Sequence, residues 1–391
     1  MNLCILDDDP QYGHLLSLVA EKNGWHPVHF CQPDEFFSRS PGSVKVLVLD
    51  LIMPNFDGIE VIRRLAAMDI KPNLILISGF DTRVLHSAQQ FATAHHFNVL
   101  ASMTKPLKIE AFESTLQKVQ LDQHDIQATS RVEKTYAAEE LSVAIDKQQL
   151  VAFLQPQVDV KTGELRSAEV LARWQHPEDG IVYPDSFIPL AESSSLIQPL
   201  TNEILRLSIQ ALKHLSASGI NVPLSVNLTA SDVKDLSFPE RLKNLCEEHQ
   251  VQPEQLVLEL TESAVMGELT SSLDVLNRLR MKGFKLSIDD FGTGYSSFSH
   301  LYQAPFSELK IDHSFVIPML EDNEAMVIVK ICVSLGHMLG MKIVAEGVEN
   351  DDIRHALEEL GCDIAQGYEY AKPLPFAEFV NWHNKRSKGR P

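Results

Sequence analysis

Two adjacent carboxylates, Asp289 and Asp290, end an apolar, strand-like stretch and precede a glycine-rich turn in the segment KLSIDDFGTGYSS. Each negative charge disfavours ionisation of the other, and a surface turn gains little from such a pair. A divalent cation would remove the conflict, because it prefers oxygen ligands and supplies the missing positive charge. The pair therefore predicts a metal site whose other ligands come from elsewhere in the chain.

Further polar side chains stand at the ends of other strand-like runs in the second half of the chain. They are Glu169, Asn227, Glu259, Lys310, Glu346 and Gln366. Oxygen ligands of this kind favour Mg²⁺ or Mn²⁺ over zinc, and shared aspartates can hold two such ions about 3.5–4 Å apart. We expect Asp289 to bridge two metals and Asp290 to hold the second, so that activated water attacks a phosphodiester in line. Lys310 would orient that water or offset phosphate charge.

Each of these residues also has a purely structural interpretation. Asn227 after a strand is commonly a turn or cap residue, and Glu259 or Glu262 could cap a helix. The functional interpretation depends on the joint pattern, because carboxylate and amide groups follow one strand-like run after another.

The first half carries a second set of polar strand ends, namely Asp7, Asp8, Asp50, Ser78 and Lys105. Three carboxylates that converge at one sheet edge would repel each other unless they share a cation, and one Mg²⁺ suits this arrangement. A carboxylate can also accept a phosphoryl group, whose oxygens Ser78 and Lys105 would then contact. Taken alone, an acid at a strand end is as often a helix cap.

Two α/β regions are needed to bring these strand ends together. Residues 1–120 alternate continuous apolar runs with helix-like segments, which indicates a doubly wound, flavodoxin-like α/β domain. Residues 121–138 are polar and lack strand-like runs, so we interpret them as a linker. Residues 139–391 repeat β/α units over roughly 250 residues, which favours a TIM-type (β/α)8 barrel. In both folds the site lies at the carboxyl ends of the strands.

The composition limits the partners and the compartment. The chain has 391 residues, 44% of them apolar, and a formal net charge of −19, which argues against a nucleic-acid polymer or an anionic membrane as partner. Its five cysteines show no CxxC spacing and read as reduced thiols. We expect no signal peptide and no membrane span, and therefore a cytoplasmic protein.

The segments ILDDDP, VLDLIMPNFDG, LISG and TKP follow one another in the first 120 residues. Haloacid-dehalogenase-like phosphatases also carry an acidic motif after the first strand, but their acidic pair comes late in the chain. The order here resembles the receiver domain of two-component response regulators. This resemblance implies that a sensor histidine kinase or a phosphotransfer protein phosphorylates Asp50.

The receiver resemblance also implies a role for each polar residue at the strand ends of the first half. Asp8, Asp50 and the backbone carbonyl of Ile52 would bind one Mg²⁺ directly, and Asp7 would act through water. Ser78 and Lys105 would form the switch pair. Ser102 departs from the pattern, because receivers commonly carry a switching Tyr or Phe at this position, three residues before the lysine.

Residues 139 to about 385 contain FLQPQVD, AEVLARWQHPEDGIVYPDSFIPLAE, SVNLT, LELTES, IDDFGTGYSS, LKID, VAEGVE and QGYEYAKPLP in this order. The region resembles the EAL domain of cyclic di-GMP phosphodiesterases, and its name-giving triplet reads Glu-Val-Leu at 169–171. The resemblance implies a modified TIM barrel that hydrolyses cyclic di-GMP to linear pGpG with Mg²⁺ or Mn²⁺.

The EAL resemblance further implies a role for each matching residue. The first metal would be bound by Glu169, Asn227, Glu259 and Asp289, and the second by Asp289 and Asp290. Glu346 would be a general base or a ligand through water, and Lys310 would position the water. The nucleotide pocket would be lined by Gln155, Leu171, Arg173 and Gln366. Glu262 would brace the loop DFGTGYSS, and Glu349 would support the site.

Both resemblances together predict a two-component response regulator that hydrolyses cyclic di-GMP under the control of Asp50 phosphorylation. A receiver followed by an EAL region implies a homo-oligomer, either a dimer or a tetramer. Two alternatives stay open. One is a sensor that binds cyclic di-GMP without hydrolysis, and the other is a signalling scaffold whose barrel mainly dimerises.

Overall fold

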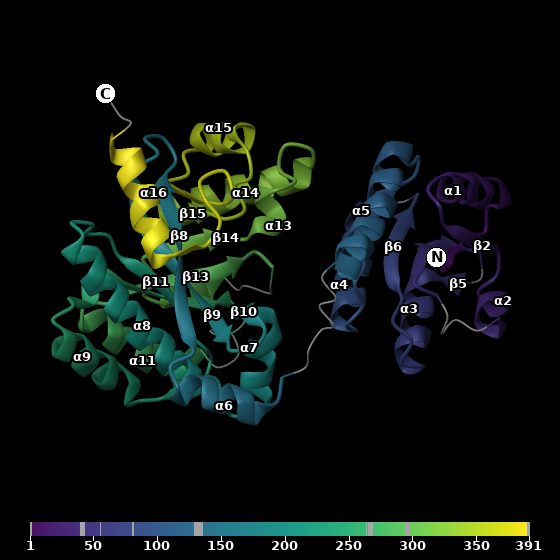
Figure 1. Ribbon diagram of the computed structural model, residues 1–391. Coiled ribbons are helices and arrows are strands. Elements are labelled where there is room, and N and C mark those ends of the chain that lie inside the picture. The colour runs from purple at the N-terminus through teal and green to yellow at the C-terminus, as the bar shows by residue number, and fades with distance from the viewer. Residues whose placement is uncertain are drawn as a thin grey trace. The chain divides into compact units, whose positions relative to one another are not determined.

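Strands of the first unit form an open parallel sheet. The computed structural model describes residues 2–39, 44–54, 56–79, 82–128, 136–262, 264, 269–293 and 298–388, and the chain divides into units Met1–Val132 and Glu133–Pro391 (Figure 1). The strands of the first sheet are β1 (Asn2–Leu6), β2 (His26–Phe30), β3 (Val46–Asp50), β6 (Asn73–Ser78) and β7 (Val99–Thr104). Their order β2-β1-β3-β6-β7 is that of flavodoxin-like doubly wound folds.

Helices cover both faces of this sheet. They are α1 (Pro10–Lys22), α2 (Pro33–Ser38), α3 (Gly58–Ala67), α4 (Thr82–Ala94) and α5 (Ile109–Ala128), and a short hairpin pairs β4 (Ile52–Met53) with β5 (Phe56–Asp57). Alternate strand residues feed two separate cores. Leu6 and Leu49 pack with residues of α2 to α4, whereas Ile5 and Val48 pack with residues of α1 and α5. The interior positions of β1 and β3 are therefore apolar on both faces of the sheet.

Within the described residues, eight strands of the second unit close into a barrel. They are β8 (Leu150–Asp159), β9 (Leu165–His176), β11 (Leu224–Asn227), β12 (Leu256–Thr261), β13 (Lys285–Phe291), β14 (Glu308–Ile311), β15 (Lys342–Ala345) and β16 (Ile364–Gln366). Strand β8 closes the ring because it pairs with both β9 and β16, in each case antiparallel. Residues 160–164 are too few for the helical crossover that a parallel connection needs. The predicted fold class is thus confirmed for both units.

The remaining elements of the second unit surround the barrel. The helices are α6 (Ala138–Asp146), α7 (Pro184–Ser193), α8 (Ile197–Ala217), α9 (Phe238–His249), α11 (Leu269–Met281), α12 (Phe298–Gln303), α13 (His313–Val316), α14 (Asn323–Met338), α15 (Asp351–Leu360) and α16 (Phe376–Lys388). Short strands β10 (Gly180–Val182) and β17 (Leu374–Pro375) extend the sheet, and 3₁₀ turns lie at η2 (Asp232–Lys234) and η3 (Pro253–Gln255). Helix α5 continues through Ala128, into the segment predicted as a linker.

The barrel strands alternate between an apolar outer face and a polar inner face. On β12, Leu258 and Leu260 belong to the large core that includes residues of the surrounding helices. The intervening Glu259 is fully buried and faces Lys310 across the interior. The period-2 geometry of strands therefore packs the leucines outside and the charged groups inside.

Among the described residues, no helix has both the length and the apolar character needed to cross a bilayer.

Candidate functional site

The ammonium of Lys310 lies at the centre of the barrel's acidic residues. Its Nζ is 2.7 Å from Glu346 Oε1, 2.8 Å from Glu259 Oε2 and 3.1 Å from Asp289 Oδ1. Glu169 Oε2 lies farther away, at 3.8 Å. The structure thus brings together the predicted side chains from four strands and from the residue directly after β15. Glu259, Asp289, Lys310 and Glu346 lie in or just after the second half of their strands, whereas Glu169 lies in the first half of the long strand β9. One fully buried cation faces four carboxyl groups here, so ionisation of all four would leave excess negative charge.

An irregularity in β13 positions the adjacent carboxylates. The pairing of β13 with β14 shifts register between Ile288 and Phe291. Within this bulge Asp290 has a φ of 54°, a left-handed conformation that is uncommon outside glycine. Bulges re-aim side chains, and backbone strain of this kind is frequent at functional sites. Asp289, Asp290 and Glu346 each offer an oxygen within 4.8 Å of the others, a spacing that could hold a metal ion.

Burial shifts the proton affinities of the cluster. Burial, together with the charges of Asp289 and Glu169, raises the pKa of Glu346 to about 8 although Lys310 opposes the shift. Burial would lower the pKa of Lys310, but the surrounding carboxylates outweigh it and raise that pKa well above its usual value. Burial and the neighbouring Asp289 raise the pKa of Asp290 to about 6. Negative charge is therefore costly here unless a cation joins the cluster.

Amide groups hold Glu169 from two sides. Asn227 Nδ2 donates to Glu169 Oε1 at 3.0 Å, which leaves the Asn227 carbonyl oxygen as a ligand atom for a cation. Gln366 Nε2 donates to Glu169 Oε2 at 2.6 Å and also to Gln155 Oε1 at 3.0 Å. Two of the predicted site residues, Asn227 and Gln366, thus fix the orientation of a third, Glu169.

A cavity of about 300 Å³ opens beside this cluster. Among its lining residues are seven that the sequence singled out, namely Gln155, Glu169, Leu171, Asp289, Glu346, Glu349 and Gln366. It is also lined by His313, Ile317 and Tyr368, which the sequence analysis missed. Asn227 does not line this cavity but a neighbouring one of about 550 Å³, which shares Leu171 with it.

Arg173 is buried beside the cavity and does not line it. Its guanidinium lies 4.9 Å from the ring centroid of Tyr183 and 5.4 Å from that of Phe153. Burial lowers its pKa, and its Nε has no hydrogen-bond partner among the described residues. The sequence predicted a phosphate contact at this position, and the unsatisfied donor is compatible with one.

Glu262 contacts the start of the glycine-rich loop. Its Oε2 accepts a hydrogen bond of 3.1 Å from the backbone N–H of Gly292, and its side chain is buried. Residues 294–297 of the predicted loop lie outside the described residues. Within the described residues, Glu262 therefore contacts the segment that follows Asp289 and Asp290.

Asp312 and His313 are further members of the site that sequence reasoning missed. His313 Nδ1 lies 2.8 Å from Asp312 Oδ2, and both residues offer ligand atoms within 4.8 Å of Glu346. Burial opposes ionisation of Asp312, but hydrogen bonds from His313 and Ser314 outweigh it and lower its pKa to about 2. An acid directly after the strand ELKI was a visible signal for Asp312.

The first unit contains a separate acidic pocket at the ends of β1, β3 and β7. Asp7, Asp8 and Asp50 offer oxygens within 4.8 Å of one another. Lys105 Nζ lies 2.6 Å from Asp50 Oδ2 and 2.8 Å from Asp7 Oδ2. Burial raises the pKa of Asp50 although hydrogen bonds from Ile52 and Lys105 oppose the shift. The structure therefore gathers the predicted phosphoacceptor, its acidic neighbours and the lysine.

Other predicted residues of the first unit lie around this pocket. Ser78 is fully buried at the end of β6, and its carbonyl accepts a hydrogen bond from Lys105 N at 2.8 Å. The backbone N–H of Ile52 donates to Asp50 Oδ1 at 3.0 Å. Ser102 Oγ donates to Gln89 Oε1 at 3.0 Å, so a polar contact occupies the position of the usual aromatic switch.

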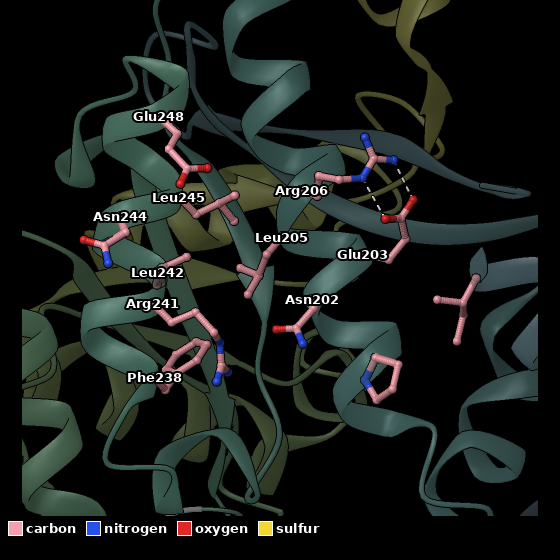
Figure 2. Close-up of a pocket in the computed structure, with 12 residues that line it drawn as sticks. Asn202, Glu203, Leu205, Arg206, Phe238, Arg241, Leu242, Asn244, Leu245 and Glu248 are labelled. Atoms are coloured by element: carbon pink, nitrogen blue, oxygen red, sulfur yellow. Dashed lines mark hydrogen bonds and ion pairs between the residues drawn. The ribbon is translucent and has the colours of Figure 1, made fainter. Parts of the chain in front are cut away.

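A third pocket lies on the outside of the second unit, between α8 and α9 (Figure 2). Its volume is about 520 Å³, and Glu203 and Arg206 of α8 pair across two hydrogen bonds of 2.6 and 2.7 Å on its wall. Leu205 of α8 and Leu242 and Leu245 of α9 also line it. None of the residues that the sequence predicted for the site lines this pocket, so it is separate from the strand-end cluster.

The geometry defines an acidic site at the mouth of a β/α barrel, in a chain whose other unit has the size and fold of a receiver domain. A family model described as the EAL domain matches residues 138–373. The chain therefore belongs to the EAL domain family.

The chain is also similar to individual proteins that contain EAL domains. Cyclic di-GMP phosphodiesterase RocR of Pseudomonas aeruginosa is 31% identical to this chain, and the match covers 98% of each. Cyclic di-GMP phosphodiesterase PA2567 of the same organism is 36% identical, but the match covers 58% of this chain and 39% of that longer protein. The solved structure of PaMucR phosphodiesterase with c-di-GMP matches with a TM-score of 0.59 and 36% identity, over 62% of this chain and 98% of that one.

Proposed function

We propose that the second unit hydrolyses cyclic di-GMP to linear pGpG and that phosphorylation of Asp50 in the first unit regulates this activity. The observation that carries the proposal is the buried acidic cluster around Lys310, in a chain that matches RocR along 98% of its length. A sensor histidine kinase or a phosphotransfer protein would supply the phosphoryl group, and the protein would act as a homo-oligomer.

The donor set of the cluster fits divalent cations. Glu259 Oε1 is buried and has no hydrogen-bond partner among the described residues, so a cation would satisfy an atom that is otherwise costly to bury. Carboxylate and amide oxygens without a thiolate favour Mg²⁺ or Mn²⁺. One ion would be held by Glu169, Asn227, Glu259 and Asp289. A second would be held by Asp289 and Asp290. The first unit would hold one Mg²⁺ at Asp8, Asp50 and the Ile52 carbonyl, with Asp7 acting through water.

The chain's own residues would orient the substrate and handle the proton. When bound, the ions would supply stabilisation of phosphate charge and a nucleophilic water at neutral pH. Glu346 Oε1, with its raised pKa and its position 2.7 Å from Lys310 Nζ, would accept the proton that the attacking water gives up. Lys310 would hold that water in line with the scissile bond.

The remaining predicted residues would bind the dinucleotide. Gln155, Leu171 and Gln366 line the cavity from three strands, and Glu349 completes its wall. Arg173 would turn its planar guanidinium to a phosphate, a pairing whose geometry is bidentate. Glu262 would keep the loop after Asp290 in place through its bond to Gly292.

The test is product analysis with a matched variant. Purified protein and its Glu346→Gln variant are incubated with cyclic di-GMP and Mg²⁺, and the nucleotides are separated by chromatography. We expect pGpG from the wild type and none from the variant, with both proteins unfolding at similar temperatures. Unhydrolysed cyclic di-GMP retained by the wild-type protein would instead identify a sensor, and failure to bind it at all would favour a scaffold.

A further inference from the structure

A directed chain of hydrogen bonds runs through the barrel interior to Glu169. Ser167 Oγ donates to Gln157 Oε1 at 2.6 Å, and Gln157 Nε2 donates to Gln366 Oε1 at 2.8 Å. Gln366 Nε2 in turn donates to Glu169 Oε2 at 2.6 Å. All four side chains are buried, and that of Gln157 is 0% exposed. Three strands, β8, β9 and β16, thus contribute to one buried polar chain.

The chemistry of Glu169 fixes the polarity of every bond in this chain. An ionised carboxylate only accepts hydrogen bonds, so Gln366 must turn its NH₂ group toward Glu169. The carbonyl of Gln366 then faces Gln157, which must present its own NH₂ group. The carbonyl of Gln157 in turn faces the hydroxyl of Ser167. Each amide therefore has one orientation in which all groups are satisfied.

A branch of the chain reaches the substrate cavity. The second N–H of Gln366 donates to Gln155 Oε1 at 3.0 Å, and Gln155 Nε2 donates to the Ala371 carbonyl at 3.2 Å. An inverted Gln366 amide would place its oxygen against the oxygens of both Glu169 and Gln155. Gln157 adds to this preference, because it donates to the Gln366 carbonyl oxygen only in the orientation that the structure shows.

We propose that Gln157 is a positioning residue for the metal site: by donating to Gln366 it locks the amide that holds the ligand Glu169. The proposal rests on the metal-dependent function proposed above. Partners of metal ligands fix ligand orientation, and their loss typically lowers metal affinity about 10- to 100-fold. Gln157 itself would touch neither the metal nor the substrate.

Metal binding by the full-length protein, measured without substrate, tests this role. Mn²⁺ is titrated calorimetrically into the wild type and into the Gln157→Glu and Gln157→Leu variants. An ionised carboxylate at 157 would compete with Glu169 for the NH₂ group of Gln366, so we expect affinity to fall about 10-fold or more. Leucine removes the donor without attracting that group, so its loss should be smaller. Gln175→Glu adds the same charge at an exposed position of β9 and should leave affinity unchanged.

Further outcomes separate positioning from packing. Raising Mn²⁺ should restore hydrolysis by the Gln157 variants, because only affinity is impaired, whereas a packing defect would persist at saturating metal. If Gln157→Glu does not fold, Ser167→Ala is measured in its place, because it removes only the far end of the hydrogen-bond chain. It should weaken Mn²⁺ binding about threefold, which is less than the effect of losing a direct partner of the ligand. Wild-type Mn²⁺ affinity in all folded variants would overturn the proposal. A wild type that binds Mn²⁺ but does not cleave cyclic di-GMP would refute the proposed function alone.

Discussion

The two acidic pockets of this protein use the same kinds of side chain but differ in how far their lysines are enclosed. In the first unit the ammonium of Lys105 bridges two carboxylates, and in the second that of Lys310 bridges three within 3.1 Å. The side chain of Lys105 is 22% exposed, whereas that of Lys310 is 1% exposed. An open sheet leaves its strand ends at an accessible edge, while a closed barrel surrounds them.

This difference in enclosure suits two different kinds of chemistry. The proposed phosphoacceptor Asp50 would have to be reached by another protein. Its own side chain is 4% exposed, but that of the adjacent Lys105 is 22% exposed. A hydrolytic centre gains from excluding bulk water, because electrostatic interactions strengthen in a low-dielectric site. Burial raises the pKa of Glu346 to about 8, so enclosure changes the chemistry of an ordinary carboxyl. Residue type alone therefore does not distinguish the two pockets.

The largest expected effect comes from removing an acid of the enclosed pocket. Asp289→Asn replaces the carboxylate that both proposed metals share, so hydrolysis should fall on the order of 1,000-fold, equivalent to about 4 kcal/mol of barrier. Turnover of cyclic di-GMP at saturating Mg²⁺ measures this loss. Asp352→Asn, an exposed acid at the start of α15, should keep wild-type turnover. Activity above a tenth of wild type in Asp289→Asn would contradict the assignment.

Removal of the two lysines compares the pockets directly. Lys310→Met leaves buried carboxylates without a cation, so the metal-free protein should lose about 3–5 kcal/mol of unfolding free energy. Lys105→Met should cost clearly less, because the ammonium that it removes is partly exposed and contacts two carboxylates where Lys310 contacts three. Urea unfolding in the presence of a chelator measures both values, and added Mn²⁺ should recover more stability in Lys310→Met than in the wild type. Equal losses in the two variants would remove the basis of the comparison.

Loss of the proposed phosphoacceptor, Asp50, should affect regulation and not hydrolysis itself. Asp50→Asn removes the group that would form the aspartyl-phosphate but leaves the barrel intact, so basal turnover should stay within about twofold of wild type. The response to acetyl phosphate should disappear. Initial rates with and without acetyl phosphate measure both quantities. A variant without basal turnover would show that the first unit takes part in hydrolysis itself.

The smallest expected effect is a dependence of stability on pH. The pKa of Asp312 is lowered to about 2, so its ionised form stabilises the fold above the usual value of 3.8, and this contribution disappears as the pH falls from 3.8 toward 2. Asp312→Asn should therefore be less stable than wild type at pH 5, and the difference should shrink at pH 3. Urea unfolding midpoints at both values measure it, and a constant difference would argue against the assignment.

Much of the site could be predicted from where polar residues interrupt apolar strands. The strand ends marked Glu169, Glu259, Asp289 and Glu346 before any geometry was known, and their register in the barrel brings them around Lys310. The same logic missed Asp312 and His313, because it stopped at the last inward-facing residue of each strand. Asp312 and His313 reach the cluster around Glu346 only because the turn into α13 lies beside the cavity.

Other features could not be derived from the local sequence. The bulge of β13 and the φ of 54° at Asp290 follow from strand pairing across the barrel. The bond between Gln157 and Gln366 joins residues 209 positions apart and requires the barrel to close. Such contacts depend on closure and register, which periodicity alone does not fix.

The most direct test of the central claim is hydrolysis of cyclic di-GMP by the purified full-length protein with Mg²⁺, in parallel samples with and without acetyl phosphate. Chromatography of the nucleotides over time gives the rate of pGpG formation in each. We predict linear product in both samples at different rates, which would establish the enclosed pocket as the hydrolytic centre and the open pocket as its switch. Absence of pGpG from both samples, with the cyclic dinucleotide unchanged, would contradict the account.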